Sequence, residues 1–111
     1  MENINIDDFS KVEIKIGRII EAEKLIESNK LLKLKVDFGN EDVRQVLSGI
    51  AKYYNTEDIL NKEFAFVTNL EPRKMLEYES QAMILACHDE TTNTVSALMP
   101  DKEVGPGSKV N

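Results

Sequence analysis

Apolar and polar residues alternate with a period of two along much of the chain, which is the pattern of half-buried β-strands. The clearest case is the segment 31–38, where positions 32, 34, 36 and 38 are apolar and positions 33, 35 and 37 are charged. An earlier segment, 12–16, repeats the alternation until Gly17 interrupts it. The adjacent Ile19 and Ile20 then break the period, so we expect a bulge or a sharp bend in this first strand.

The remaining pattern adds short strands and little helix. Strands are predicted at 43–47, 63–69, 81–87 and 94–99, and short helical pieces at 7–12 (capped by an aspartate), at 50–54 and after Thr56. The stretch 71–74 is expected to be a loop, because Pro72 disfavours helix at the residue before it. Five or six short strands predict an all-β fold. A five-stranded oligonucleotide-binding (OB) barrel fits this count, with a helix inserted between its third and fourth strands.

Length and composition predict one compact domain over residues 1–111, with 41% apolar residues to form its core. No run approaches the roughly 20 apolar residues that would span a bilayer. The N-terminus lacks the basic and apolar regions of a signal peptide. The single cysteine, Cys87, excludes an internal disulfide and fits a reducing compartment. We therefore expect a cytoplasmic location.

The formal net charge of −6 counts against nucleic-acid binding, because phosphate groups favour a basic surface. The distribution of charge changes this picture. Residues 1–28 carry four basic and seven acidic side chains, whereas residues 28–54 carry five basic and three acidic ones. A basic face on an acidic body is therefore possible. RNA binding through such a face should be moderate in affinity and strongly salt-dependent.

Catalytic and metal chemistry find little support in the residue types present. Cys87 and His88 are the only cysteine and the only histidine, and neighbours on a strand point to opposite faces, so they should not form a catalytic pair. A buried thiol and a surface histidine are the expected arrangement. One histidine and one cysteine cannot supply a metal site, and no phosphate loop, dinucleotide fingerprint or serine elbow occurs. We expect neither an enzyme nor a cofactor.

Six stretches in a fixed order carry a further signal. They are 12–23 (VEIKIGRIIEAE), 29–39 (NKLLKLKVDFG), 44–50 (RQVLSGI), 69–74 (NLEPRK), 79–86 (ESQAMILA) and 100–110 (PDKEVGPGSKV). Together they resemble the tRNA-binding domain found at the C-terminus of many methionyl-tRNA synthetases. The same family occurs as free-standing tRNA-binding proteins, in the β chains of phenylalanyl-tRNA synthetases and in the endothelial monocyte-activating polypeptide. The resemblance covers nearly the whole chain.

The resemblance implies an OB barrel with a C-terminal β extension that recognises tRNA by shape and backbone. Such domains raise the tRNA affinity of a catalytic partner, here methionyl-tRNA synthetase, and relatives are commonly homodimers joined through additions that include the C-terminal segment. The candidate tRNA-binding residues that the resemblance implies are Asn29, Lys30, Lys33, Arg44, Ser48, Asn69, Arg73, Lys74, Ser80 and Met83.

Elementary chemistry supports part of this set. Lys33 lies on the polar face of its strand, so its ammonium group should point outward. Arg73 and Lys74 can meet a phosphate as a planar fork plus a point charge. Arg44 and Ser48 share one face of the third strand, where a charge and a hydroxyl could contact the RNA backbone.

Two aspects of the predicted surface stay open. Met83 could touch a base or ribose through its thioether, or it could fill the core. Tyr53 and Tyr54 could stack on bases. Since they follow the third strand directly, we expect them to cover the end of the barrel instead.

Departures from the family pattern point towards weaker RNA binding. Glu71 stands where lysine is common, Glu77 and Ala82 stand where glycine is expected, and the chain is more acidic than most relatives. The net acidity favours an alternative, a chaperone-like protein-export factor with the same barrel. The pair Arg73–Lys74 favours tRNA binding.

Overall fold

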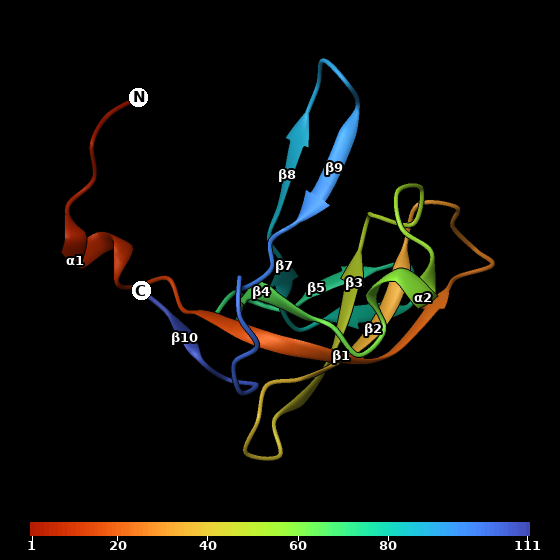
Figure 1. Ribbon diagram of the computed structural model, residues 1–111, viewed down its shortest axis with the longest axis horizontal. Coiled ribbons are helices and arrows are strands. Elements are labelled where there is room, and N and C mark those ends of the chain that lie inside the picture. Colours follow the sequence, from red (N-terminus) through yellow and green to blue (C-terminus); the bar gives the residue numbers. More distant parts are fainter.

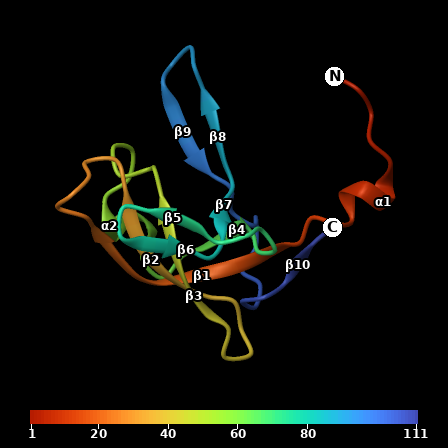
Figure 2. The same cartoon turned by 180° about the vertical axis from the view of Figure 1, so that it is seen from behind.

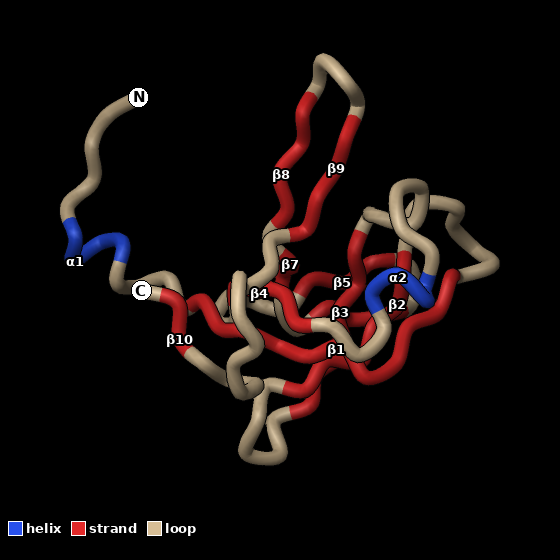
Figure 3. Tube along the Cα trace, in the orientation of Figure 1, coloured by secondary structure: helices blue, strands red, loops and turns tan.

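The computed structural model describes residues 1–111 as a set of short antiparallel strands with little helix (Figures 1 and 3). Five strands form a sheet in the order β3-β2-β1-β4-β7, which curls into a nearly closed barrel. Their bounds are β1 (Ile14–Lys24), β2 (Leu32–Asp37), β3 (Val43–Ser48), β4 (Glu63–Val67) and β7 (Met83–Ile84). The predicted OB-like barrel is confirmed.

The other elements are short additions to the barrel. They are the one-turn helices α1 (Ile6–Phe9) and α2 (Thr56–Ile59), the hairpins β5 (Arg73–Met75)–β6 (Tyr78–Ser80) and β8 (Ala86–Asp89)–β9 (Thr94–Ala97), and β10 (Lys109–Val110), which pairs with the start of β1. The β8–β9 hairpin projects from the barrel, and α1 lies on an N-terminal arm away from it (Figures 1 and 2). No helix has the length and apolar character that crossing a membrane requires.

Alternation along the strands builds the core. The even-numbered side chains of β2 are buried, while the odd-numbered ones reach solvent at least in part. Phe38 packs edge to face on Phe66 of β4, with the ring centroids 5.3 Å apart. Burying one such side chain contributes about 1.5–3 kcal/mol to folding, so this pair is a main anchor of the barrel.

The strand β1 serves two partners and bends between them. It pairs with β4 through residues 14–18 and with β2 through residues 18–24, and its register with β2 shifts between Ile19 and Glu21. This is the predicted bulge. Gly17 does not interrupt the strand but lies inside β1. This position requires glycine, because a Cβ there would lie 2.5 Å from Val36 Cγ1.

Side chains close the barrel along the free edge of β3. The Gln45 N–H donates to Gln81 Oε1 at 2.9 Å, and the Leu47 N–H donates to Ser80 Oγ at 3.0 Å. One backbone bond, from the Gln81 N–H to the Gln45 carbonyl at 2.9 Å, completes this seam. Side-chain oxygens thus replace the backbone acceptors that a regular strand ladder would supply.

Two local predictions in the second half of the chain are wrong. Arg73 and Lys74 are not loop residues but begin β5, because their pairing with β6 satisfies the backbone. The segment 81–87 is not one strand. It breaks at Leu85, whose N–H donates to the Ala65 carbonyl and whose carbonyl accepts from Leu98, as the chain leaves the barrel.

Three further details are corrected. The first helix begins earlier than predicted, and Asn5 caps it by accepting a hydrogen bond from the Asp8 N–H. Residues 50–54 form a turn rather than a helical piece. Cys87 is exposed rather than buried, because it lies on the projecting hairpin.

Candidate nucleic-acid interface

A groove of about 370 Å³ runs over strands β1, β2 and β3. Strand register decides which side chains face each other there: Glu21 lies opposite Lys35, and Glu23 lies opposite Lys33. The groove is lined by Glu21, Ala22, Glu23, Lys33, Leu34, Lys35, Val43, Arg44 and Gln45.

Each groove lysine forms an ion pair with the glutamate across from it. Lys33 Nζ lies 2.8 Å from Glu23 Oε1, and Lys35 Nζ lies 2.7 Å from Glu21 Oε2. The hydrogen bond from Lys35 lowers the pKa of Glu21 below its ordinary value of 4.5. The hydrogen bond with Glu23 raises the pKa of Lys33 above its ordinary value of 10.5. Both shifts favour the charged forms of Glu21 and Lys33, so the groove floor is polar and carries both signs of charge.

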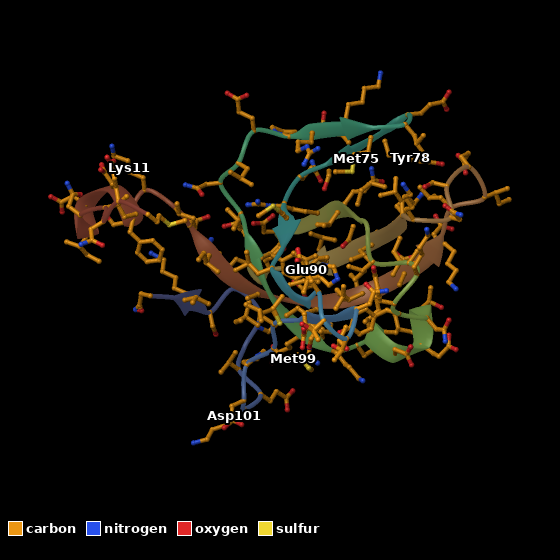
Figure 4. The ribbon with its side chains drawn as sticks, turned by 90° about the horizontal axis from the view of Figure 1, so that it is seen from above. Lys11, Met75, Tyr78, Glu90, Met99 and Asp101 are labelled. Carbon is orange, nitrogen blue, oxygen red and sulfur yellow. The ribbon has the colours of Figure 1, made fainter.

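The β5–β6 hairpin borders this groove. The Tyr78 ring lies 4.8 Å from Lys33 Nζ, and the Gln45 side chain donates to the Glu79 carbonyl at 3.0 Å. Figure 4 shows Tyr78 beside Met75, its partner across the hairpin. β6 thus lies beside Lys33 and Gln45 of the groove, and β5, its hairpin partner, is called the rim below.

The rim carries two exposed cations of the predicted site. Arg73 and Lys74 are exposed, and neither lies within ion-pair distance of an acid. Arg73 also lines a small hollow of about 30 Å³ together with Ser80 and Met83. The structure therefore brings these three predicted residues together.

Arg44 reaches the end of the barrel and is held by the protein's own acceptors. Its Nε and Nη2 each lie 3.0 Å from an oxygen of Asp42, and its Nη1 donates to the Thr68 carbonyl at 2.6 Å. The guanidinium carbon also lies 5.3 Å from the centre of the Phe38 ring. In this structure the Arg44 side chain therefore braces the barrel.

Three polar residues of the predicted set also support the fold. Ser48 shares the inward face of β3 with Arg44 and is buried, and Ser80 is the buried hydroxyl of the seam. The Asn69 amide donates to the Lys11 carbonyl and accepts from the Glu13 N–H, so it holds the N-terminal arm on the barrel.

The remaining predicted residues lie on the surface. Asn29 and Lys30 are exposed in the loop between β1 and β2, where the Lys30 carbonyl accepts from Ala51. Met83 is 43% exposed, which excludes the core alternative for its side chain. Tyr54 packs against the core as expected, whereas Tyr53 is exposed rather than covering the barrel end.

Several groove residues were not in the predicted set. Lys35 could have been found, since it alternates with Lys33 on the same strand. The positions of Glu21 and Glu23 opposite the lysines depend on strand register. The position of Tyr78 beside Lys33 depends on the β5–β6 hairpin, which the sequence does not signal. These partners become visible only in the folded chain.

Comparison with known proteins identifies the fold family. Residues 14–109 match the family model described as "Putative tRNA binding domain". The chain belongs to this family. The tRNA-binding domain is 42% identical over 111 residues to a methionine–tRNA ligase of Caldanaerobacter subterraneus and 48% identical over 107 residues to one of Methanoregula boonei. These two matches span 100% and 96% of this chain but only 17% and 15% of the length of the ligases.

Solved structures of similar length have the same barrel. A methionyl-tRNA-synthetase-related protein of Pyrococcus horikoshii is 38% identical with a TM-score of 0.92, over 99% of both chains. The chaperone CsaA of Bacillus anthracis is 27% identical with a TM-score of 0.89, over 99% of this chain and 100% of that one. The tRNA-binding domain therefore shares its full architecture with both kinds of protein.

Proposed function

We propose that the domain, a single module over residues 1–111, binds tRNA as an auxiliary part of a methionine–tRNA ligase. The family match over residues 14–109 carries the proposal. The module would raise the effective concentration of tRNA near the catalytic part, through tethering rather than chemistry. The ligation reaction would take place outside this domain. Its location in the cytoplasm stays a prediction.

The contacts we propose follow from accessibility. Arg73 and Lys74 on the rim are free to meet phosphates, and Lys30 in the neighbouring loop adds a third exposed cation. Asn29 and Met83 would contact ribose or base edges. Lys33 would join them from the groove floor, and the other four predicted residues would act mainly by supporting this surface.

A chaperone-like function is the second candidate. Two CsaA proteins share the barrel at 27% and 29% identity, and a net charge of −6 suits a polypeptide ligand better than RNA. The relatives from methionine–tRNA ligases are more similar, at 40–48% identity. We therefore rank tRNA binding first.

The test is a titration of the purified protein against bulk tRNA and a duplex RNA of matched length at two salt concentrations. Wild type should bind tRNA, and more weakly at the higher salt concentration, because phosphate contacts release counterions. R73E/K74E should weaken binding by about tenfold or more, since two contacts turn repulsive.

The matched control is K62E/K102E, which makes the same change in net charge. Asp101, the neighbour of Lys102, lies on the opposite side of the molecule from Tyr78 (Figure 4). This variant should bind within about threefold of wild type, because exposed charges beyond the Debye length are screened. Absence of tRNA binding by wild type even at low salt would contradict the proposal and favour the polypeptide-binding alternative.

A homodimer is part of the proposal. The four residues of α1 are all exposed, and the apolar side chains of Ile4, Ile6 and Phe9 lie on this arm. Leu98 and Met99 add apolar surface after β9. Covering such surface in a symmetric pair would remove it from water.

A further inference from the structure

We propose that Glu21 and Glu23 set the affinity of the groove for RNA, by holding its two lysines in ion pairs that an incoming phosphate must displace. The inference rests on the proposed tRNA binding and concerns its strength. It assigns a role to two acidic residues that would otherwise only count against the function.

In both ion pairs the glutamate side chain is the more exposed partner. The Lys33 side chain is 29% exposed and its partner Glu23 is 59% exposed, while Lys35 and Glu21 are 54% and 65% exposed. An approaching phosphate therefore meets a lysine that is already paired with an exposed carboxylate. The phosphate and the glutamate carboxylate repel each other, and the lysine must leave its ion pair with the glutamate to bind the phosphate.

A second layer of contacts encloses Lys33. Its ammonium group lies over the Tyr78 ring, and the Tyr78 hydroxyl donates to Glu27 Oε2 at 3.3 Å. Arg44, the third cation of the groove lining, is held by Asp42. Every cation of the groove is therefore matched by an acid, in contrast to the free Arg73 and Lys74 of the rim.

This division between rim and groove has a measurable consequence. In wild type, the rim should supply most of the phosphate contacts. Removing the two groove carboxylates frees two cations, and each added phosphate contact steepens the slope of log K against log salt by about 0.9. A purely structural role of the glutamates would leave that slope unchanged.

The test compares E21Q/E23Q with wild type in the tRNA titration, over a series of salt concentrations. Affinity at low salt should rise about tenfold, and the salt slope should steepen by about one to two. The control is E2Q/E90Q, which changes the net charge equally at two exposed positions, one before α1 and one between β8 and β9, where neither carboxylate forms an ion pair. It should change affinity by less than about twofold. An equal rise in both variants would overturn the proposal.

A double-mutant cycle tests the lysines themselves. K33Q/K35Q should cost less than about threefold in the wild-type background and about tenfold in the E21Q/E23Q background, because the lysines are masked only in the former. Additive effects would overturn the proposal while leaving the tRNA function intact. Absence of tRNA binding by wild type, even at low salt, would refute the tRNA function and this proposal with it. Circular dichroism should show all variants folded, since exposed ion pairs contribute little to stability.

Discussion

At the level of single residues, the buried Thr68 couples the start of β1 to the end of β4. Its hydroxyl donates to Glu13 Oε1 at 2.6 Å, and this bond, with the nearby Lys15 charge, lowers the pKa of Glu13 below its ordinary value of 4.5. A carboxyl whose pKa is lower in the folded state stabilises the fold above the unfolded pKa. That stability is lost as pH falls through the folded value.

Thr68→Val should therefore destabilise the domain by about 1 kcal/mol at pH 7, a low value for a bond to a charged group because Glu13 is partly exposed. The loss should shrink below pH 4.5, as Glu13 takes up a proton. Urea denaturation at several pH values measures both. Lys15→Gln, which removes only a 3.7 Å ion pair, serves as the control and should cost less than about 0.5 kcal/mol. A pH-independent loss in T68V would contradict the assignment.

At the level of elements, the long strand β1 depends on the absence of a side chain at its middle. A Cβ on Gly17 would lie 2.5 Å from Val36 Cγ1 and 2.7 Å from Phe38 Cε1, and both neighbours are buried. Gly17→Ala should cost about 1–3 kcal/mol, through overpacking. Gly49→Ala is the matched control, because a Cβ there meets nothing within 4 Å. This variant should change the free energy of unfolding by less than about 0.5 kcal/mol. Equal denaturation midpoints for the two variants would refute the packing argument.

The same elements explain what sequence reasoning could reach. β2 was predicted because one of its faces is buried and the other is not. The β5–β6 hairpin was missed because its strands have three residues each and its turn uses Leu76 at φ 56°, with no glycine to signal it. At the site, the outward lysines followed from alternation. Their glutamate partners did not, because the bulge after Ile19 fixes the register and a shift by one residue would reverse the faces.

Arg44 shows the limit of such reasoning at the site. An arginine next to an apolar strand residue looks like a surface cation, and its position on the same face as Ser48 was predicted. Whether that face points to solvent or into the barrel was not predicted. The carbonyls that hold Arg44 belong to Thr68 and Gln81, which are distant in the sequence and meet it only when the barrel closes.

At the level of the whole molecule, the proposed homodimer makes a direct prediction. Sedimentation equilibrium should give twice the monomer mass of 12.6 kDa, since an arm with no buried residue gains by being covered. Ile6→Glu/Phe9→Glu should shift the protein to monomer, because two charges would have to be buried in the contact. Its thermal midpoint at low concentration should stay near that of wild type, as neither side chain packs in the barrel. A concentration-independent monomer mass for wild type would exclude the dimer.

The seam between β3 and residues 80–81 has a consequence for misfolding. Most of its hydrogen bonds use side-chain oxygens of Ser80 and Gln81, so the barrel is fastened there by two residues rather than by a continuous ladder. If they release, the molecule becomes an open curved sheet with the β3 edge bare. An unpaired strand edge can form hydrogen bonds with strands of other chains. Ser80 and Gln81 therefore also protect the protein from aggregation.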